Sequence, residues 1–341
     1  RVSLLVYDID YDYYAEQRSG VLGYFWGKDY YPDGTFAGIR SNVGEILYFD
    51  SHFADAFTDY IRTTLLHEYQ HMINFNRFAR PAADGGKNLV VPTWYNEMLS
   101  MLAEDLIFPG LAHDNPQEAE ATYPRNSRMP FHLANNGYFS EVGLTEWGTS
   151  PDALYASYGS AFAFGAYLVR NWGGVDLVHR LMNGNYVGPR AISEALYELN
   201  AENGTAFPAP TGSEDVSIFR EAFRKYGETY VFSGSSVPAG VASFSNEPSS
   251  STLDSGGETY AYDVTGFDIW GITNWVRHDA NPSLPFGLTG PFVWVFERFP
   301  LRPYAVDLQS CAEWMRVTGD ITMTIDLPPQ GSGVELYLMV R

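Results

Sequence analysis

Two histidines and a glutamate stand at a spacing that suits metal-dependent hydrolysis. They occur in the stretch His67-Glu-Tyr-Gln-His71. Positions four apart project from one face of a helix, so both imidazoles can bind one Zn²⁺. The carboxylate of Glu68, beside the first ring, can then accept the proton of a zinc-bound water as that water attacks a carbonyl carbon. The motif therefore predicts a zinc site with Glu68 as general base.

The competing interpretation is a pair of core histidines satisfied by hydrogen bonds. The flanking residues are strongly apolar, since Leu65-Leu66 precede the motif and Met72-Ile73 follow it. Two imidazoles and a carboxylate are costly to bury in such a helix without a partner, which favours a bound metal. The single cysteine, Cys311, lacks the paired spacing of a thiolate site. The metal ligands must therefore be histidines and carboxylates.

A catalytic zinc ion needs a third protein ligand, and Glu97 is the first candidate. It lies 26 positions after His71, at the start of the next expected helix. Two helices joined by a loop of about fifteen residues can lie antiparallel, which brings the first turn of the second helix back to the histidines. The alternative is that Glu97 only complements the dipole of its helix. We favour Glu97 as a ligand.

The residues around these positions resemble a known family. The resemblance lies in two stretches, His67-Glu-Tyr-Gln-His-Met-Ile-Asn74 and Trp94-Tyr-Asn-Glu-Met-Leu-Ser100, and in the approach to the first of them, Gly20 to Trp26 and Glu45 to Asp50. They are similar to the hyicolysin family of secreted bacterial neutral metallopeptidases, within the gluzincin group. The similarity covers roughly residues 1 to 227. It implies a thermolysin-like zincin fold and a zinc-dependent endopeptidase that hydrolyses proteins.

The resemblance also implies roles for individual residues. The zinc ligands would be His67, His71 and Glu97, and the general base would be Glu68. Many gluzincins carry an aspartate four residues after the glutamate ligand to orient a histidine, but Met101 stands there in this chain. Ser100 or Glu104 could supply that contact instead.

Hydrolysis also needs a hydrogen-bond donor that stabilises the oxyanion formed on attack. The segment that begins Tyr155-Ala-Ser-Tyr158-Gly is similar to the Tyr-x-x-Gly start of a helix that follows the zinc site in gluzincin aminopeptidases. That match makes Tyr158 the candidate donor. The alternative is an ordinary half-buried tyrosine among the 24 in the chain. Rival donors are His113, His132 and His179.

A second ligand set stays open. The stretch Gly148-Thr-Ser-Pro-Asp-Ala-Leu-Tyr155 resembles the Gly-Thr-x-x-Asp-x-x-Tyr motif of aspzincins, whose aspartate is the third zinc ligand. The match fails at its final glycine, since Ala156 follows. Pro151 also makes the segment a turn that enters a helix, where Asp152 can act as a cap. Asp152 is therefore the alternative third ligand to Glu97.

Periodicity predicts the elements that must position these residues. Short β-type runs over residues 2 to 7 and 45 to 49 predict a small sheet. Apolar spacing predicts a buried helix over residues 59 to 78, which carries the motif, and a second helix with Thr93 as its N-cap. Residues 111 to 150 lack a period and predict a long irregular segment. Four further helices are expected, over residues 161–171, 175–182, 190–199 and 216–226.

We therefore expect an α+β chain with two domains. The catalytic domain would span residues 1–232, with an α+β part to about residue 110, a mainly helical part from about 151, and the metal in a cleft between them. After residue 233 the sequence becomes rich in Gly, Ser and Pro, with short β-branched and aromatic runs. This texture predicts a C-terminal β-sandwich over residues 233–341.

The composition excludes several classes of partner. The 341 residues include 41 acidic and 21 basic side chains, a formal net charge of -20, which opposes binding to nucleic acid or to an anionic membrane surface. No apolar run approaches the roughly 20 residues of a membrane helix. Protein or peptide substrates are the expected partners, and a monomer is favoured. A Ca²⁺ site is a weaker hypothesis, because the candidate carboxylates lack the pattern of an EF-hand loop and suit solvated turns: Asp8, Asp10, Asp12, Asp29 and Asp33.

Two other functions stay open. One is a catalytically inactive metallopeptidase-like module for adhesion or binding, with the β-domain as its recognition element. The complete motif argues against it. The other is an aminopeptidase. Composition does not decide the compartment, so the expectation of a secreted, extracellular bacterial protein depends on the family resemblance alone.

Overall fold

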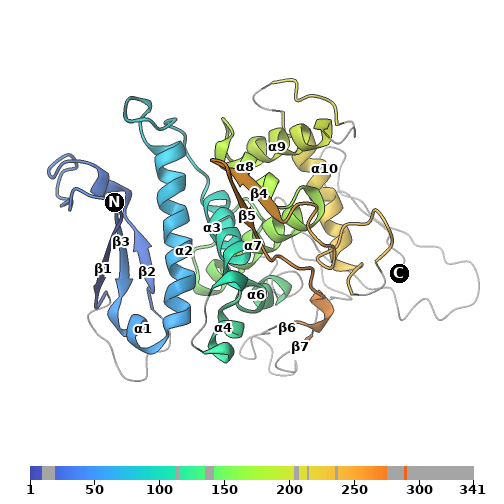
Figure 1. Cartoon of the computed structure of the whole chain (residues 1–341), viewed down its shortest axis with the longest axis horizontal. Coiled ribbons are helices and arrows are strands. Elements are labelled where there is room, and N and C mark those ends of the chain that lie inside the picture. The colour runs from blue at the N-terminus through green and yellow to red at the C-terminus, as the bar shows by residue number, and fades with distance from the viewer. Residues whose placement is uncertain are drawn as a thin grey trace, which may run out of the picture.

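The computed structural model describes residues 1–9, 20–111, 115–134, 142–202, 207–212, 215–234, 237–274 and 288–289. In these residues a small three-stranded sheet lies beside a larger group of helices (Figure 1). The long helix α2 (Thr58–Asn74) stands between the sheet and the other helices. This arrangement agrees with the expected α+β class. Among the described helices, none is both long enough and apolar enough to cross a membrane.

The N-terminal sheet contains β1 (Ser3–Tyr7), β2 (Gly23–Phe25) and β3 (Ile46–Asp50) in the order β1-β3-β2. The central strand β3 pairs in parallel with β1 and antiparallel with β2. Its Leu47 and Phe49 are buried and pack with Met72 of α2. β1 and β3 match the expected runs. β2 was not predicted, because three residues are too few to show alternation, yet it forms the edge of the sheet that lies against α2.

The helix with the motif is fixed to the end of the sheet. Asp50, the last residue of β3, caps α1 (Ser51–Ala56) by accepting hydrogen bonds from the backbone amides of His52 and Phe53. α2 follows and continues into one π-helical turn, η2 (Phe75–Ala79). The helix expected over residues 59 to 78 is therefore confirmed, with a change of helix type in its last turn.

The second helix of the site is α3 (Thr93–Ile107), which packs directly against α2. The prediction of Thr93 as its N-cap is wrong, because Pro92 holds that position and Thr93 is the first helical residue. The carbonyl oxygen of Pro92 accepts hydrogen bonds from the amides of Tyr95 and Asn96, which starts the helix without a side-chain cap. α3 is buried along most of its length.

The expectation of an irregular segment over residues 111 to 150 is wrong in part. Three short helices lie there: α4 (Pro116–Thr122), α5 (Pro124–Ser127) and α6 (Met129–Ala134). Each has a proline at its first or second position, where the missing amide costs nothing and the ring favours the helical φ angle. Helices of four to seven residues are too short to show an apolar period.

The helical part forms the main core. It contains α7 (Pro151–Trp172), α8 (Val175–Asn183), α9 (Gly188–Glu202) and α10 (Ser217–Tyr226), which confirms the four expected helices, although α7 begins ten residues earlier than predicted. The largest hydrophobic cluster joins α3 and α7 to α8, α9 and α10. Short 3-10 turns complete the described elements: η1 (Gly27–Tyr30), η3 (Ala82–Asp84), η4 (Phe108–Gly110), η6 (Gly227–Tyr230) and η7 (Ile269–Gly271).

The described residues after 233 pack on the helical part. β4 (Thr252–Ser255) and β5 (Glu258–Ala261) form an antiparallel hairpin, and β6 (Thr273–Asn274) pairs with β7 (Leu288–Thr289). Phe244, Phe267 and Ile269 belong to the same hydrophobic cluster as α3 and α7. Most of the expected β-sandwich falls outside the described residues, so the sandwich and the boundary at 233 stay predictions.

Candidate active site

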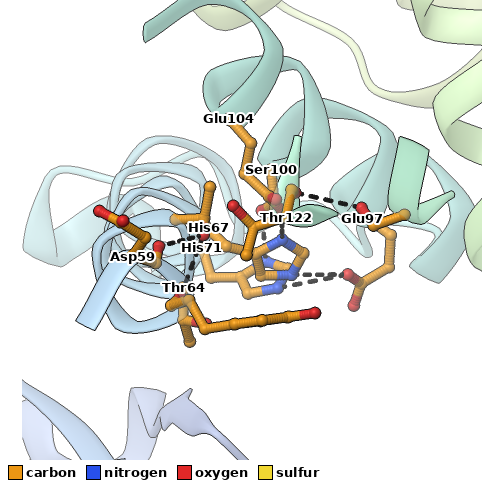
Figure 2. A network of polar contacts seen from close by, with 11 residues as sticks. Asp59, Thr64, His67, His71, Glu97, Ser100, Glu104 and Thr122 are labelled. Atoms are coloured by element: carbon orange, nitrogen blue, oxygen red, sulfur yellow. Dashed lines mark hydrogen bonds and ion pairs between the residues drawn. The ribbon is translucent and has the colours of Figure 1, made fainter. Parts of the chain in front are cut away.

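The two histidines of the motif and Glu97 meet between α2 and α3. His67 Nε2 lies 3.0 Å from Oε2 of Glu97, and His71 Nε2 lies 3.5 Å from the same oxygen. Figure 2 shows both imidazole rings on one face of α2, turned toward the Glu97 carboxylate on the neighbouring helix. The shared face follows from the spacing of four residues. Three potential metal ligands therefore converge on one point.

The other ring nitrogens of the two histidines bind a second row of side chains on α3. Nδ1 of His67 lies 2.7 Å from Oε1 of Glu104, and Nδ1 of His71 lies 3.0 Å from Oγ of Ser100 (Figure 2). Glu104 and Ser100 are both buried. Such contacts fix the orientation of a ring and leave its Nε2 atom free to bind a metal. One helix thus supplies Glu97 and the partners of both histidines.

This donor set fits a metal ion. Within the described part of the chain, one group of three or more His, Cys, Asp or Glu side chains could hold a metal, namely His67, His71 and Glu97, whose ligand atoms lie within 4.8 Å of one another. Two imidazoles and one carboxylate form a ligand set typical of a catalytic zinc site that keeps a fourth position open.

The pKa shifts of His67 and Glu97 show how strongly these side chains interact. Burial lowers the pKa of His67, but hydrogen bonds to Glu104 and Glu97 outweigh this effect and raise it to about 10. Burial raises the pKa of Glu97, and the hydrogen bonds from the two histidines overcome it and hold that pKa well below its usual range. The buried carboxylate is therefore ionised, as a metal ligand must be.

Glu68 lies beside this group and is 8% exposed. Burial raises the pKa of its carboxyl group, while the two histidines and the backbone amide of Phe25 lower it in part. Phe25 belongs to the edge strand β2, so the sheet contacts the side chain of Glu68 on α2. A carboxylate with a raised pKa, next to a candidate metal site, suits a group that accepts and returns a proton.

A cavity of about 600 Å³ opens over these residues. Its lining comes from the edge strand, the two helices, the turn after α2, the loop before α3, and α7: Gly23, Tyr24, Phe25, His67, Glu68, His71, Asn74, Phe75, Ala79, Leu89, Val90, Val91, Asn96 and Tyr158. The two candidate metal-binding histidines, the candidate base and the candidate oxyanion donor thus share one cavity.

Comparison with known proteins gives the family. A family model described as peptidase M30 matches residues 2–211. The chain belongs to the peptidase M30 family. It is also 26% identical over 256 residues to the neutral metalloprotease ShpI of Staphylococcus hyicus, an alignment that covers 73% of this chain and 51% of that protein. The chain thus spans about half the length of this relative. The resemblance to the hyicolysin family is confirmed.

In this M30 chain, Tyr158 comes from the second turn of α7 and lines the cavity. Its ring packs edge-on against Trp147, with centroids 5.0 Å apart, and the guanidinium of Arg128 lies 5.5 Å from its centre. Burial, and then the charge of Glu97, raise the pKa of the phenol, so its oxygen keeps its proton. Tyr158 can therefore donate a hydrogen bond into the cavity.

The rival donors are placed differently. His132 is buried in another network, where its Nε2 lies 2.9 Å from the hydroxyl of Tyr226 and 2.8 Å from that of Tyr230. His179 is exposed on α8. His113 lies outside the described residues. Neither of the two described histidines lines the cavity.

The alternative ligand Asp152 lies in the first turn of α7, but its side chain is outside the described residues. The expectation of Asp152 as a cap is replaced by Ser150, which accepts a hydrogen bond from the amide of Ala153. Ala153 belongs to a small apolar cluster of its own. The group of ligands that the structure does bring together contains Glu97.

The candidate calcium ligands that are described have protein partners. Asp29 is buried and accepts hydrogen bonds from the amide of Asn42 and the hydroxyl of Tyr48. Asp33 is bound to Arg40 and the amide of Ser41. Asp10 and Asp12 lie outside the described residues. These contacts give no support to a Ca²⁺ site.

Two cavity residues, Asn74 and Asn96, were not predicted as site residues. Asn74 is the third member of the series 67, 71 and 74, which repeats on one helix face, and Asn96 directly precedes Glu97. The helical spacing could have indicated Asn74. The resemblance included Gly20 to Trp26, but no alternation there indicated the strand β2, which supplies three residues of the lining.

Proposed function

We propose that this M30 chain is a zinc-dependent endopeptidase that hydrolyses peptide bonds of proteins, with Glu68 as general base. The observation that carries the proposal is the convergence of His67 Nε2, His71 Nε2 and the Glu97 carboxylate beside a cavity that both histidines and Glu68 line. The thermolysin-like zincin arrangement is part of the same proposal. We also propose that the protein is exported, on the family resemblance alone.

In this proposal His67, His71 and Glu97 hold the zinc ion. Glu104 and Ser100 engage the Nδ1 atoms, so that both rings present Nε2 to the metal. Held by these residues, a zinc ion would supply a Lewis acid that polarises the scissile carbonyl group and lowers the pKa of water. Asp152 is the competing third ligand.

Glu68 carries the proton between the two halves of the reaction. Its carboxylate accepts a proton from the attacking water and then delivers it to the nitrogen of the leaving amine. Burial raises the pKa of this carboxyl group, which makes the protonated form accessible between the two transfers. Tyr158 donates its hydroxyl proton in a hydrogen bond to the oxyanion, and its raised pKa keeps that proton in place.

The edge strand β2 supports an extended peptide substrate. Among the described strands, β3 is its one partner, and Gly23, Tyr24 and Phe25 line the cavity beside Glu68. An edge strand binds extended peptides through main-chain hydrogen bonds, which depend little on sequence. Such binding favours the interior of a polypeptide over its terminus, and therefore an endopeptidase over an aminopeptidase.

The test uses the variant Glu68→Gln, which removes the base and keeps the size of the side chain. We expect the purified variant to retain one zinc ion per chain and to lose cleavage of an internally quenched peptide with an acetylated N-terminus. Glu120→Gln, an exposed glutamate on α4, is the matched control and should cleave normally. An active Glu68→Gln protein would contradict the proposal.

The native protein distinguishes the two alternative functions. If it binds zinc but cleaves no peptide, the inactive binding module replaces the endopeptidase. Cleavage only of peptides with a free N-terminus would indicate an aminopeptidase.

A further inference from the structure

A buried amide in the cavity has an unused hydrogen-bond acceptor. Asn74 is 1% exposed and lines the cavity at the C-terminal end of α2. Its Nδ2 donates a hydrogen bond of 2.7 Å to Oδ1 of Asn96 on α3. Its own Oδ1 is buried and accepts no hydrogen bond from the residues that the structure describes. A buried carbonyl oxygen without a hydrogen-bond donor costs free energy. A ligand that donates a hydrogen bond to Oδ1 of Asn74 would remove this cost.

The surroundings of the two asparagines are apolar. Around this end of the cavity lie Phe75, Ala79, Leu89 and Val91, from the turn after α2 and from the loop before α3. The acidic residue in the cavity lining is Glu68, three residues before His71. Glu97, next to Asn96, is not part of the lining, and its carboxylate faces the two histidines. A cation between such walls would need a countercharge, and a carboxamide oxygen provides none. The environment suits a neutral group with an apolar body.

We propose that Asn74 and Asn96 form the floor of a specificity subsite, which takes a substrate side chain with an apolar body and a neutral hydrogen-bond donor at its tip. Tyrosine is the side chain that fits this description best. Its ring fills the space between the apolar walls, and its hydroxyl donates to Oδ1 of Asn74. The subsite rests on the proposed function, because it selects the substrate of the same metal centre.

The direction of β2 places the subsite relative to the bond that is cleaved. β2 begins beside Asp50, whose amide donates to the carbonyl oxygen of Leu22, and Asp50 precedes α1 and α2. It ends at Phe25, whose ring lies 5.6 Å from that of Phe75 at the other end of α2. β2 and α2 therefore run in the same direction.

An added strand pairs more strongly when it is antiparallel to its neighbour. A peptide antiparallel to β2 has its N-terminal part at the end of the cavity where β2 finishes. That end contains Asn74. The subsite therefore receives a residue on the N-terminal side of the scissile bond.

Binding of peptides to an uncleaving protein tests the subsite. The probes are pairs of fluorescein-labelled peptides that differ by tyrosine or phenylalanine at one of the three positions before the scissile bond. Fluorescence anisotropy measures their Kd with the zinc-loaded Glu68→Gln protein. At one position we expect the tyrosine peptide to bind about tenfold more tightly, as one neutral hydrogen bond provides. Adding Asn74→Leu should bring that ratio to about one and leave the phenylalanine peptide bound.

Two further variants separate recognition from folding. Asn74→Asp keeps the size and the acceptor but adds a charge, so it should favour lysine over tyrosine at the same position. Asn76→Leu removes an asparagine that bonds Tyr30 outside the cavity lining, and it should leave the tyrosine preference unchanged. Equal Kd values of the tyrosine and phenylalanine peptides with the Glu68→Gln protein would overturn the subsite. So would an unchanged ratio of the two Kd values after Asn74→Leu, or an equal loss of affinity for both peptides.

The proposed function is tested separately, by measuring whether the native protein cleaves the same peptides. Cleavage without a preference for tyrosine would refute the subsite and leave the endopeptidase intact. A preference in binding without any cleavage would refute the endopeptidase and leave the subsite.

Discussion

At the scale of single residues, the ring nitrogens of His67 and His71 have divided roles. Each Nε2 faces Glu97, and each Nδ1 is held by a side chain of α3. The spacing of the motif predicted that both rings share a face, because that follows from the helical repeat. Which oxygen would hold each Nδ1 could not be derived, since it depends on how α3 is rotated against α2. The resemblance left Ser100 and Glu104 open, and the structure brings one to each histidine.

The first prediction concerns Glu104. The change Glu104→Gln keeps an oxygen that can accept from Nδ1 of His67 but removes the charge that makes this hydrogen bond strong. We expect zinc affinity to fall by about tenfold, within the range found for such outer contacts. Competition with a chromophoric chelator measures the affinity. Glu198→Gln on α9, which pairs with Arg180 at the surface, is the matched control. Equal zinc affinity of native protein and Glu104→Gln would show that the contact does not support the metal.

The second prediction concerns pH and His132. Burial lowers the pKa of this histidine to about 3 in the folded protein, whereas an unfolded chain has the ordinary value of about 6.5. Between these values the unfolded chain binds a proton that the folded chain does not, so the free energy of unfolding falls as the pH falls from about 6.5 toward 3. The slope is about 1.4 kcal/mol per pH unit, or about 2 kcal/mol at pH 5.

Urea unfolding of metal-free protein at pH 5 and at pH 7 measures this loss. His132→Gln, which keeps a neutral polar side chain beside the hydroxyls of Tyr226 and Tyr230, should lose about 2 kcal/mol less between the two pH values than the native protein. The exposed residue His179 supplies the control, and His179→Gln should follow the native protein. Equal losses for native protein and His132→Gln would mean that His132 is protonated in the folded state.

At the scale of elements, length decided what could be predicted. The helix around His67 and the long helices after residue 155 repeat their apolar positions over several turns, and the structure contains them. The strand β2 and the helices α4, α5 and α6 were missed because they span three to seven residues. The missed strand matters most, since it closes one side of the cavity. Short elements are defined by what packs on them, which a local pattern does not contain.

The third prediction tests the packing of α6 on α7 at Gly159, next to Tyr158. A Cβ atom at this position would lie 2.7 Å from the backbone nitrogen of His132 and 2.8 Å from the carbonyl oxygen of Arg128. Backbone atoms cannot move aside alone, so the change Gly159→Ala must push the two helices apart. We expect a loss of about 1–3 kcal/mol in the free energy of unfolding, together with lower kcat because Tyr158 shifts.

Gly227→Ala is the control for this change. Gly227 has ordinary helical backbone angles and open space around its Cα atom, so an alanine there should be neutral or slightly stabilising. Denaturant unfolding and peptide cleavage are measured for both variants. If Gly159→Ala is as stable and as active as Gly227→Ala, the close approach of α6 to α7 is not needed to position Tyr158.

At the scale of the whole molecule, α3 is bonded to chain segments far from it in sequence. Asp105 follows Glu104 on α3, and its carboxylate binds the guanidinium of Arg170 on α7 through two hydrogen bonds, of 2.8 and 3.3 Å. Nε of Arg170 also donates to the carbonyl oxygen of Thr265, and its guanidinium lies 4.8 Å from the centre of the Phe267 ring. One buried cation thus joins α3, α7 and the segment after residue 233.

The amino-acid composition predicted a change of domain near residue 233, because Gly, Ser and Pro replace the helical pattern there. Composition does not indicate which surface of the protein a segment covers. The described residues from 242 to 269 contribute Phe244 and Ile269 to the core around α3 and α7. Part of the segment after residue 233 therefore stabilises the helical part, whatever the rest of the C-terminal region forms.

The last prediction tests this tie through Arg170→Met. Both partners of the ion pair are fully buried, so the change leaves the charge of Asp105 without its cation inside the protein. Breaking one side of a buried pair costs about 3–5 kcal/mol, whereas replacing both sides by apolar residues costs far less. We therefore expect Arg170→Met to lower the free energy of unfolding by about that amount, and Arg170→Met with Asp105→Leu to recover a large part of it.

Urea unfolding of the two single variants, the double variant and the native protein completes the cycle. Asp105 is the neighbour of Glu104, which contacts His67, so an unpaired Asp105 should disturb this contact. Zinc affinity should therefore fall in Arg170→Met and return in the double variant. Strictly additive effects on stability would show that Arg170 and Asp105 act independently, so that the buried ion pair does not join α3 to α7.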